Sequence, residues 1–273
     1  MLLGELEYFR PGSVEEAVRL LSERDNARVL AGGQTLVNVM KIRFAAPDAL
    51  VDVGRIESLR EIRVSPDGAI ELGAMVTYNE IERSEEIGLV RPVLAGVAGA
   101  IADQQVRNRG TIGGNLCAND PTNHLPPLMV ALDGEMTIVG PGGGRTVPAE
   151  TFFQGVYETA VAPGELLTAV RIPAPAPGGG DGFAALTIGK DGTGIVNVAA
   201  SLRLNGALSG VRVAIGCVDA VPVIVTADSP DGIADAVRSA GLDPPSDVHA
   251  SAEYRLHLAE VLATRAAMEA AAR

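Results

Sequence analysis

Hydrophobic and polar positions alternate with a helical period near the start of the chain. The segment Ser13–Glu16 has the Ser-x-x-Glu spacing of a capping box, and it opens an amphipathic helix that is expected to end near Ser22. An apolar run at residues 28–31 then leads through two glycines into a second helical pattern at residues 35–44. With a strand expected at residues 49–53, the segment predicts a β-turn-α-β unit.

The period changes to two on either side of a Pro-Asp-Gly turn at residues 66–68, which is typical of a β-hairpin. Beyond it, apolar and small residues again alternate between helical and strand patterns. The expected elements are a capped helix start at Thr77–Glu80, an Ala/Val-rich buried helix at 90–103, a small-residue segment at 110–120, a helix at 127–132, and strands at 136–139 and 166–172.

A Pro-Ala-Pro-Ala-Pro-Gly-Gly-Gly stretch at residues 173–180 is the clearest linker in the sequence. Strands at 195–204 and 211–218 and helices at 232–240 and 251–271 are expected after it. We therefore expect an α+β protein in three parts, which comprise residues 1–55, 56–176 and 177–273.

Composition and charge narrow the classes of function. Of the 273 residues, 47% are hydrophobic and 21% are charged, which is ordinary for a folded protein. The net charge of -12 argues against a nucleic-acid-binding groove and against docking on anionic lipid. No stretch is long and apolar enough to cross a membrane, and the first residues do not resemble a signal peptide. A cytoplasmic location is expected.

The sequence gives little support for a metal site or for a nucleophilic catalytic residue. The two cysteines, Cys117 and Cys217, lie far apart and form no Cys-x-x-Cys motif, which excludes an iron–sulfur cluster held by this chain alone. They are interpreted as buried, reduced thiols. The histidines, His124, His249 and His257, have no metal-site spacing. We expect no metal site and assign no catalytic residue.

The first candidate binding motif is an apolar strand that ends in paired glycines immediately before a helix. Glycines allow positive φ and let a ligand approach the bare backbone, and free N–H groups at a helix start hold phosphate. A plain tight turn is the alternative interpretation. The assigned residues are Val29, Leu30, Ala31, Gly32, Gly33, Gln34, Thr35 and Leu36.

The second candidate motif has paired glycines flanked by a hydroxyl and an amide, and comprises Thr111, Ile112, Gly113, Gly114 and Asn115. Two such loops predict one elongated diphosphate ligand held from two sides. Neither fits Gly-x-Gly-x-x-Gly, so a Rossmann nicotinamide site is not supported. In the glycine-rich stretch 189–194, Asp191 follows the lysine where a P-loop needs Ser or Thr. The stretch 140–144 is interpreted as a hairpin loop.

Residues 31–35 and 107–115 resemble the two flavin-binding loops of the medium subunit of the carbon monoxide dehydrogenase and xanthine dehydrogenase family. Residues 251–262 are similar to the C-terminal helix of that family. The resemblance covers nearly the whole chain. It implies a two-part FAD-binding region, like that of vanillyl-alcohol oxidase, and a smaller C-terminal α+β domain.

The resemblance also implies roles for individual residues. The two glycine segments would wrap the diphosphate and ribityl chain of FAD, Ile101 would pack on the cofactor, and the backbone of Leu167 would lie near the adenine end. Asp120 and His124 are assigned to the same cofactor site. His124 stands where relatives usually have an acidic residue, and Thr187 stands where a lysine is common. A cationic or neutral imidazole at this position would favour the anionic reduced flavin.

The implied function is an electron relay. A large subunit with molybdopterin would oxidise the substrate, and a small subunit with two [2Fe–2S] clusters would carry electrons to the FAD of this chain. The FAD would pass them to an external acceptor, in a heterohexamer with two copies of each subunit. The alternatives are a self-sufficient FAD-dependent oxidoreductase of the same binding fold and a non-catalytic module that binds a nucleotide or a partner protein.

Overall fold

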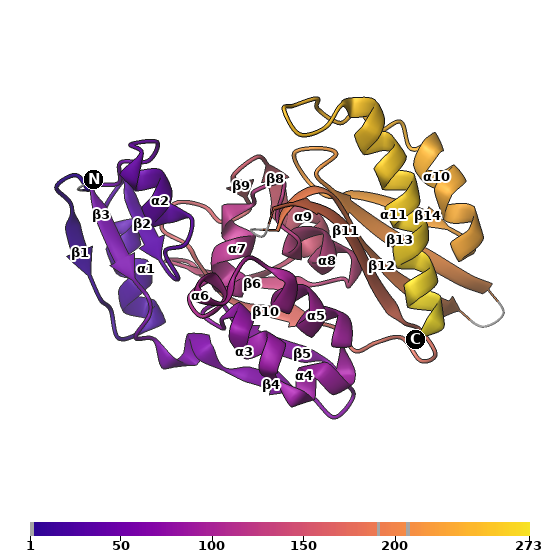
Figure 1. Ribbon diagram of the computed structural model, residues 1–273. Helices are drawn as coiled ribbons and strands as arrows, with labels where there is room; N and C mark the ends of the chain where they lie inside the picture. Colours follow the sequence, from indigo (N-terminus) through magenta and orange to yellow (C-terminus); the bar gives the residue numbers. More distant parts are fainter. Residues whose placement is uncertain (1–2, 190–191, 206–207) are drawn as a thin grey trace.

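The computed structural model describes residues 3–189, 192–205 and 208–273. The molecule is elongated, with the N-terminal sheet at one end, a central sheet and its helices in the middle, and the C-terminal sheet at the other end (Figure 1). Helices and strands are mixed throughout the described residues. This arrangement confirms the expected α+β class.

The N-terminal sheet is a small parallel sheet in the order β1-β3-β2. Its elements are β1 (Glu7–Phe9), α1 (Val14–Ser22), β2 (Ala27–Leu30), α2 (Leu36–Lys41) and β3 (Ala49–Asp52). Helix α1 begins as expected, because the Ser13 side chain accepts a hydrogen bond from the Glu16 amide. The second helix is shorter than predicted and ends at Lys41.

The central sheet is antiparallel in the order β4-β5-β10-β6-β7. The predicted hairpin at the Pro-Asp-Gly turn is present as β4 and β5, and the glycine-rich 140–144 stretch does join two strands, β6 and β7. The strands are β4 (Ile62–Val64), β5 (Ile70–Gly73), β6 (Glu135–Gly140), β7 (Gly143–Pro148) and β10 (Leu166–Ile172).

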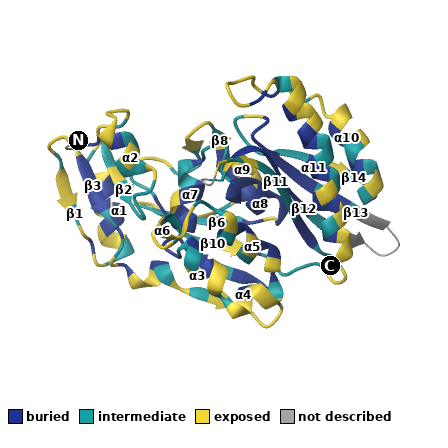
Figure 2. Ribbon diagram, viewed as in Figure 1, coloured by how far each residue is buried: buried dark blue, intermediate teal, exposed yellow. Residues whose placement is uncertain are grey.

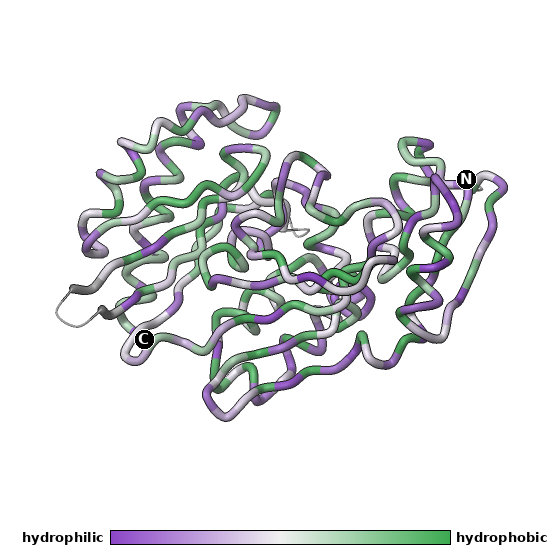
Figure 3. The backbone as a smooth tube through the Cα atoms, turned by 180° about the vertical axis from the view of Figure 1, so that it is seen from behind, coloured by the Kyte–Doolittle hydropathy of each residue, from purple (hydrophilic) through white to green (hydrophobic). Residues whose placement is uncertain are grey.

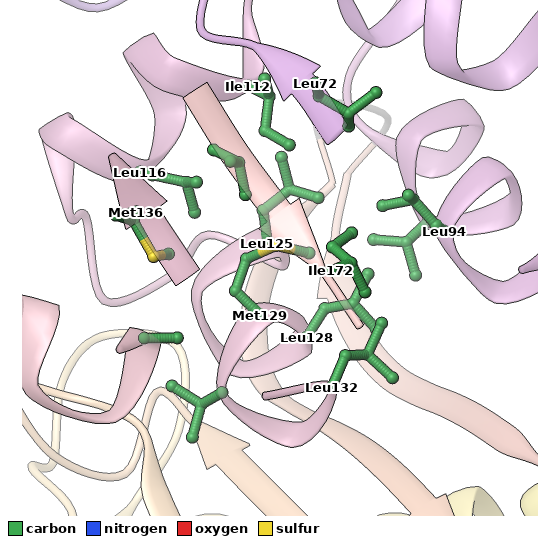
Figure 4. Close-up of a cluster of buried hydrophobic side chains, with 14 of the residues drawn as sticks. Leu72, Leu94, Ile112, Leu116, Leu125, Leu128, Met129, Leu132, Met136 and Ile172 are labelled. Carbon is green, nitrogen blue, oxygen red and sulfur yellow. The ribbon is translucent and has the colours of Figure 1, made fainter. Parts of the chain in front are cut away.

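Short helices cover this sheet, and their buried side chains meet those of the strands in one hydrophobic cluster (Figure 4). In this cluster Ile112, Leu125 and Leu128 are fully buried. The elements of this layer are η1 (Glu57–Arg60), α3 (Tyr78–Arg83), α4 (Glu85–Val90), α5 (Pro92–Ala100), α6 (Gln104–Arg107), α7 (Ile112–Ala118), α8 (Leu125–Ala131), α9 (Ala149–Phe152), β8 (Phe153–Gly155) and β9 (Glu158–Thr159).

The buried helix expected at 90–103 is present as α5, although it is shorter, because Pro92 occupies its first turn and separates it from α4. One prediction for this layer was wrong. The small-residue segment at 110–120 is largely helical rather than a loop. Its glycines lie in the first turn of α7, where the Thr111 hydroxyl accepts a hydrogen bond from the Gly114 amide and caps the helix.

The C-terminal part is an antiparallel sheet in the order β11-β12-β13-β14, with α10 and α11 packed on one face. Strands β11 and β14 were not predicted. Lys190 and Asp191 of the glycine-rich 189–194 stretch lie outside the described residues. The elements are β11 (Asp181–Ile188), β12 (Thr193–Asn205), β13 (Leu208–Gly216), β14 (Val223–Ala227), η2 (Pro230–Gly232), α10 (Ile233–Ser239) and α11 (Ala252–Ala272).

Buried residues form one cluster with each of the three larger sheets (Figure 2). Seen from behind, hydrophobic stretches follow the inner strands, and hydrophilic residues are mixed along the outer helices (Figure 3). The cluster of the N-terminal sheet also contains Met75 and Leu166, which come from the central part of the chain. No helix in the described part of the chain is long and apolar enough to cross a membrane.

Candidate flavin-binding site

The two glycine segments predicted from the sequence lie against each other. A Cβ atom added to Gly32 would stand 2.0 Å from the carbonyl oxygen of Arg109 and 3.0 Å from the Cα of Gly110. A Cβ added to Gly114 would stand 3.8 Å from that of Ala31. The fold therefore brings the residues before and within the second segment onto the first, and only glycine fits at position 32.

The first segment offers unused backbone donors. Gly33 has a φ of +72°, in the left-handed region that favours glycine. Among the described residues, no hydrogen-bond acceptor is found for the amide groups of 33–36, whereas the carbonyls of Gly33 and Thr35 accept from α2. Successive free N–H groups in such a turn form a concave surface that suits an anion.

A cavity of about 330 Å³ adjoins this turn. Five of the predicted residues line it: Leu30, Ala31, Gly32, Gly33 and Gln34. Sequence reasoning missed the other lining residues, which are Val37, Asn38, Lys41, Asp52 and Arg109. Lys41 and Arg109 bring positive charge to a cavity already lined by free amides, as a diphosphate requires.

Asp52 brings a fixed carboxylate to the same cavity. Its Oδ1 accepts from the Gly54 amide at 2.8 Å, and its Oδ2 accepts from the Tyr8 hydroxyl and lies 3.2 Å from Arg10 Nε. Asp52 ends β3 in a parallel sheet, and ligands commonly bind beyond the carboxyl ends of such strands. That position is the sequence feature from which Asp52 could have been found.

The second segment differs from the first, because its backbone donors are already used. The amide of Ile112 donates to the Val76 carbonyl at 2.9 Å, and that of Gly113 donates to the Ala74 carbonyl at 2.9 Å. The amides of Gly114 and Asn115 both donate to Thr111. This segment therefore offers close backbone approach and side chains, rather than N–H groups, to a ligand.

The side chain of Asn115 in this segment is buried and has unused hydrogen-bonding capacity. It is 8% exposed, and its Nδ2 donates to the Tyr78 hydroxyl at 3.0 Å. Its Oδ1 is buried and has no partner among the described residues. Buried acceptors are nearly always paired in folded proteins, so this atom fits a site that a ligand completes.

The remaining assigned residues lie outside the cavity. Ile101 follows α5 and packs against the central cluster, and Leu167 is buried in β10. Asp120 forms a turn in which Oδ1 accepts from the Thr122 amide at 2.9 Å, while the Tyr157 hydroxyl donates to Oδ2 at 3.2 Å. Thr187 is exposed, next to a register shift in β11.

His124 is buried at the start of α8, with 4% of its surface exposed. Its Nδ1 lies 3.1 Å from Nδ2 of Asn197, and its ring lies 5.4 Å from that of Phe183. Burial lowers the pKa of His124 to about 4, so the imidazole is neutral at neutral pH. Because the Asn197 amide donates to Nδ1, the ring proton lies on Nε2. Of the two states considered for this residue, the structure favours the neutral one.

The other residues considered for metal or nucleophilic chemistry do not form a second site in the described part of the chain. His249 and His257 are exposed, and Cys117 and Cys217 are free thiols whose pKa burial raises to about 12. Within residues 3–189, 192–205 and 208–273, no three His, Cys, Asp or Glu side chains are grouped to hold a metal ion.

Comparison with known proteins identifies the family. A family model for the FAD binding domain in molybdopterin dehydrogenase matches residues 4–175. The carbon monoxide dehydrogenase medium chain of Afipia carboxidovorans is 36% identical over 293 residues, which cover 100% of this chain and 99% of that protein. This chain belongs to the FAD-binding medium subunits of the molybdenum hydroxylase family. As a medium subunit of this family, it is a component of an oxidoreductase.

Other relatives agree with this medium-subunit family. The nicotine 6-hydroxylase medium subunit of Paenarthrobacter nicotinovorans is 35% identical over 285 residues, with 100% of both chains covered. The carbon monoxide dehydrogenase structure from Hydrogenophaga pseudoflava has a TM-score of 0.92 at 35% identity, covering 100% of this chain and 99% of that one. Quinoline 2-oxidoreductase from Pseudomonas putida 86 has a TM-score of 0.91 at 32% identity, with the same coverage. The resemblance and the fold expected from the sequence are confirmed.

Proposed function

We propose that this chain binds one FAD across the two glycine segments and is the electron-transfer subunit of a heteromeric molybdenum hydroxylase. It would take electrons from [2Fe–2S] clusters of a small subunit and pass them to an external acceptor, while a large molybdopterin subunit oxidises the substrate. The observation that carries the proposal is the contact of Gly32 with Arg109 beside a cavity lined by free amides.

The residues of the cavity fit the ADP half of FAD. The amides of 33–36 would bind phosphate oxygens, and Lys41 and Arg109 would offset the negative charge. Asp52, which its neighbours hold in place, can accept a hydrogen bond from a sugar hydroxyl. The glycines at 32 and 33 permit the close approach of the backbone that a diphosphate needs.

The residues outside the cavity would serve the rest of the cofactor. The second segment, Thr111–Asn115, would contact the ribityl chain, and Ile101, Asp120, His124 and Leu167 keep the roles that the family resemblance gives them. When bound, FAD supplies reversible electron transfer between one-electron and two-electron partners. The neutral imidazole of His124 would hold its proton on Nε2 and add no charge beside the flavin.

The same proposal covers organisation and assembly. Residues 1–55 and 56–176 would form the two-part FAD-binding region, and residues 177–273 would form a C-terminal domain. The three larger sheets of the described residues and the extent of the family match, 4–175, support this division. Medium chains named among the relatives support assembly with other subunits, and we propose two copies of each of three subunits in the cytoplasm.

The test is the flavin content of the purified full-length chain, alone and co-expressed with candidate partner subunits. We expect about one FAD per chain and an absorption band at about 450 nm, as is usual for flavins. A chain that stays colourless after incubation with FAD would leave only the non-catalytic module. A lone flavin-containing chain that oxidises a substrate by itself would favour the self-sufficient oxidoreductase.

A further inference from the structure

Tyr78 lies directly beneath the second glycine segment. Its amide donates to the Gly110 carbonyl at 3.0 Å, and a Cβ added to Gly110 would stand 2.4 Å from Cε2 of the Tyr78 ring. Gly110 in turn lies against Gly32. One layer of contacts therefore runs from the first glycine segment through Gly110 to the tyrosine ring.

The Tyr78 hydroxyl continues this layer to Asn115. It accepts from Nδ2 of Asn115 at 3.0 Å, and the two residues are 6% and 8% exposed. Burial raises the pKa of Tyr78 to about 12, so the hydroxyl stays neutral in the physiological range. The carboxamide of Asn115 is therefore held at one end by an uncharged, buried partner.

The other hydrogen-bonding groups of Asn115 can be traced one by one. Its amide donates to the Thr111 carbonyl at 3.0 Å, and its own carbonyl accepts from Nδ2 of Asn123 at 3.4 Å and from the Asn119 amide at 3.2 Å. Only Oδ1 is left without a partner among the described residues. An acceptor that is buried and unpaired destabilises a fold unless something else completes its hydrogen bond.

We propose that Tyr78 is a positioning residue of the cofactor site, whose hydroxyl holds the Asn115 carboxamide so that Oδ1 accepts from a sugar hydroxyl of the cofactor. The inference rests on the proposed function and adds a residue that does not itself touch the ligand. Without the Tyr78 hydroxyl, the carboxamide can turn over and present Nδ2 in place of the acceptor. The hydroxyl belongs either to the ribityl chain or to the ribose, which share this chemistry.

The experiment measures the dissociation constant of FAD for the full-length chain after its flavin has been removed. The variants are Tyr78→Phe, Asn115→Ala and the double variant, and Tyr254→Phe, at an exposed position of α11, is the matched control. Tyr78→Phe keeps the ring against Gly110, and the thermal midpoint without FAD checks that the fold is retained. ADP, which has the ribose but no ribityl chain, is titrated in parallel to distinguish the two hydroxyl sources.

We expect Tyr78→Phe to weaken FAD binding by about five- to tenfold, as loss of one oriented hydrogen bond does, and Asn115→Ala to weaken it at least as much. The double variant should bind like Asn115→Ala, because Tyr78 acts only through Asn115. Tyr254→Phe should bind like the wild type. If ADP binding also weakens, the hydroxyl is that of the ribose; if only FAD binding weakens, it is that of the ribityl chain.

Three outcomes would overturn the proposal. Tyr78→Phe could bind FAD within about twofold of the wild type, or the effects of the two single changes could multiply in the double variant. Asn115→Ala binding as tightly as the wild type would exclude the contact whatever Tyr78 does. A wild-type chain that binds no FAD would overturn the proposed function itself, which separates that failure from failure of the Tyr78 inference.

Discussion

Gly32 faces the carbonyl oxygen of Arg109 so closely that a methyl group at position 32 would lie 2.0 Å from that oxygen. No side chain can occupy this space, because the neighbouring atoms belong to the backbone. The contact joins the turn after β2 to the segment before α7, and Arg109 also lines the cavity beside the turn. The shape of the proposed cofactor site therefore depends on the absence of a side chain at one position.

Gly32→Ala is expected to separate the two segments and to weaken FAD binding at least about tenfold, since the backbone must shift to accept the methyl group. Gly88→Ala is the control, because a Cβ there meets no atom within 4 Å and the residue lies in α4. FAD titration of both variants checks the prediction. Equal affinity in the two variants would contradict it.

Gly33→Val and Gly114→Val test the segments separately. Gly33 has a φ of +72°, which a β-branched residue rarely adopts, and a Cβ at Gly114 would stand 2.8 Å from the Thr111 hydroxyl. The strain at position 33 should cost about 1–3 kcal/mol. We expect FAD content to fall steeply in both variants while circular dichroism remains that of a folded protein. Full occupancy in both would mean that the site is elsewhere.

His124 should make the protein less stable in acid. Its pKa is lowered from 6.5 to about 4 in the folded state, so below pH 6.5 the unfolded chain takes up a proton that the folded chain does not. The contribution of His124 to the free energy of unfolding is therefore highest above pH 6.5, and it falls progressively as the pH is lowered to 4. At pH about 4.5 the loss should be about 2 kcal/mol.

Urea unfolding at about pH 7.5 and 4.5 measures this loss in the wild type and in His124→Gln, which cannot take up the proton. His249→Gln, at an exposed position, serves as the control. The wild type and the control should lose more stability than His124→Gln. If all three proteins lose the same amount, the imidazole is not buried in solution as described.

A buried ion pair should be among the most sensitive stability sites. Arg91 Nη1 lies 2.5 Å from Asp181 Oδ2, and the two side chains are 4% and 9% exposed. Removal of one partner leaves a buried charge alone, so Asp181→Ala should cost about 3–5 kcal/mol. Asp235→Ala, which breaks an exposed pair with Arg238, should change stability little. Thermal unfolding of both variants tests this difference in stability, and similar midpoints would contradict the prediction.

Assembly is the last prediction. Affinity capture of this chain, co-expressed with a molybdopterin subunit and a [2Fe–2S] subunit from neighbouring genes, should recover all three in equal amounts. The mass of the complex, measured by light scattering, should equal two copies of each. A lone chain that is active without partners would contradict this composition.

Much of the fold could be predicted because its signals are local. The Ser13 and Thr77 caps and the Pro-Asp-Gly turn require only neighbouring residues, and the structure contains all three. Strand β1 has three residues, two of them exposed, so it shows no alternation and owes its existence to pairing with β3. Strands β11 and β14 were also missed, although each pairs with its neighbour along the chain, β12 and β13.

The candidate site, like the fold, could be predicted only where its signals are local. The glycines of the first segment indicate that a ligand can approach the backbone closely. Asp52 could have been found from its position at the end of a strand, but nothing in the sequence around Lys41 connects that residue with the cavity. The amides of Ile112 and Gly113 in the second segment donate to the carbonyls of Val76 and Ala74, which lie far from it in sequence. The tautomer of His124 also depends on Asn197, which belongs to β12 of the C-terminal sheet. These relations exist only in the folded chain.

The sharing of Leu166 between the N-terminal and central parts has a consequence for the order of events at the ribosome. The N-terminal sheet is synthesised first, yet its hydrophobic cluster contains Leu166 from β10. Nascent chains fold as their partners emerge, and here one buried member of the cluster emerges more than halfway through translation. We therefore expect the first three strands to leave the exit tunnel with an incomplete core and to become stable only after β10 has been made.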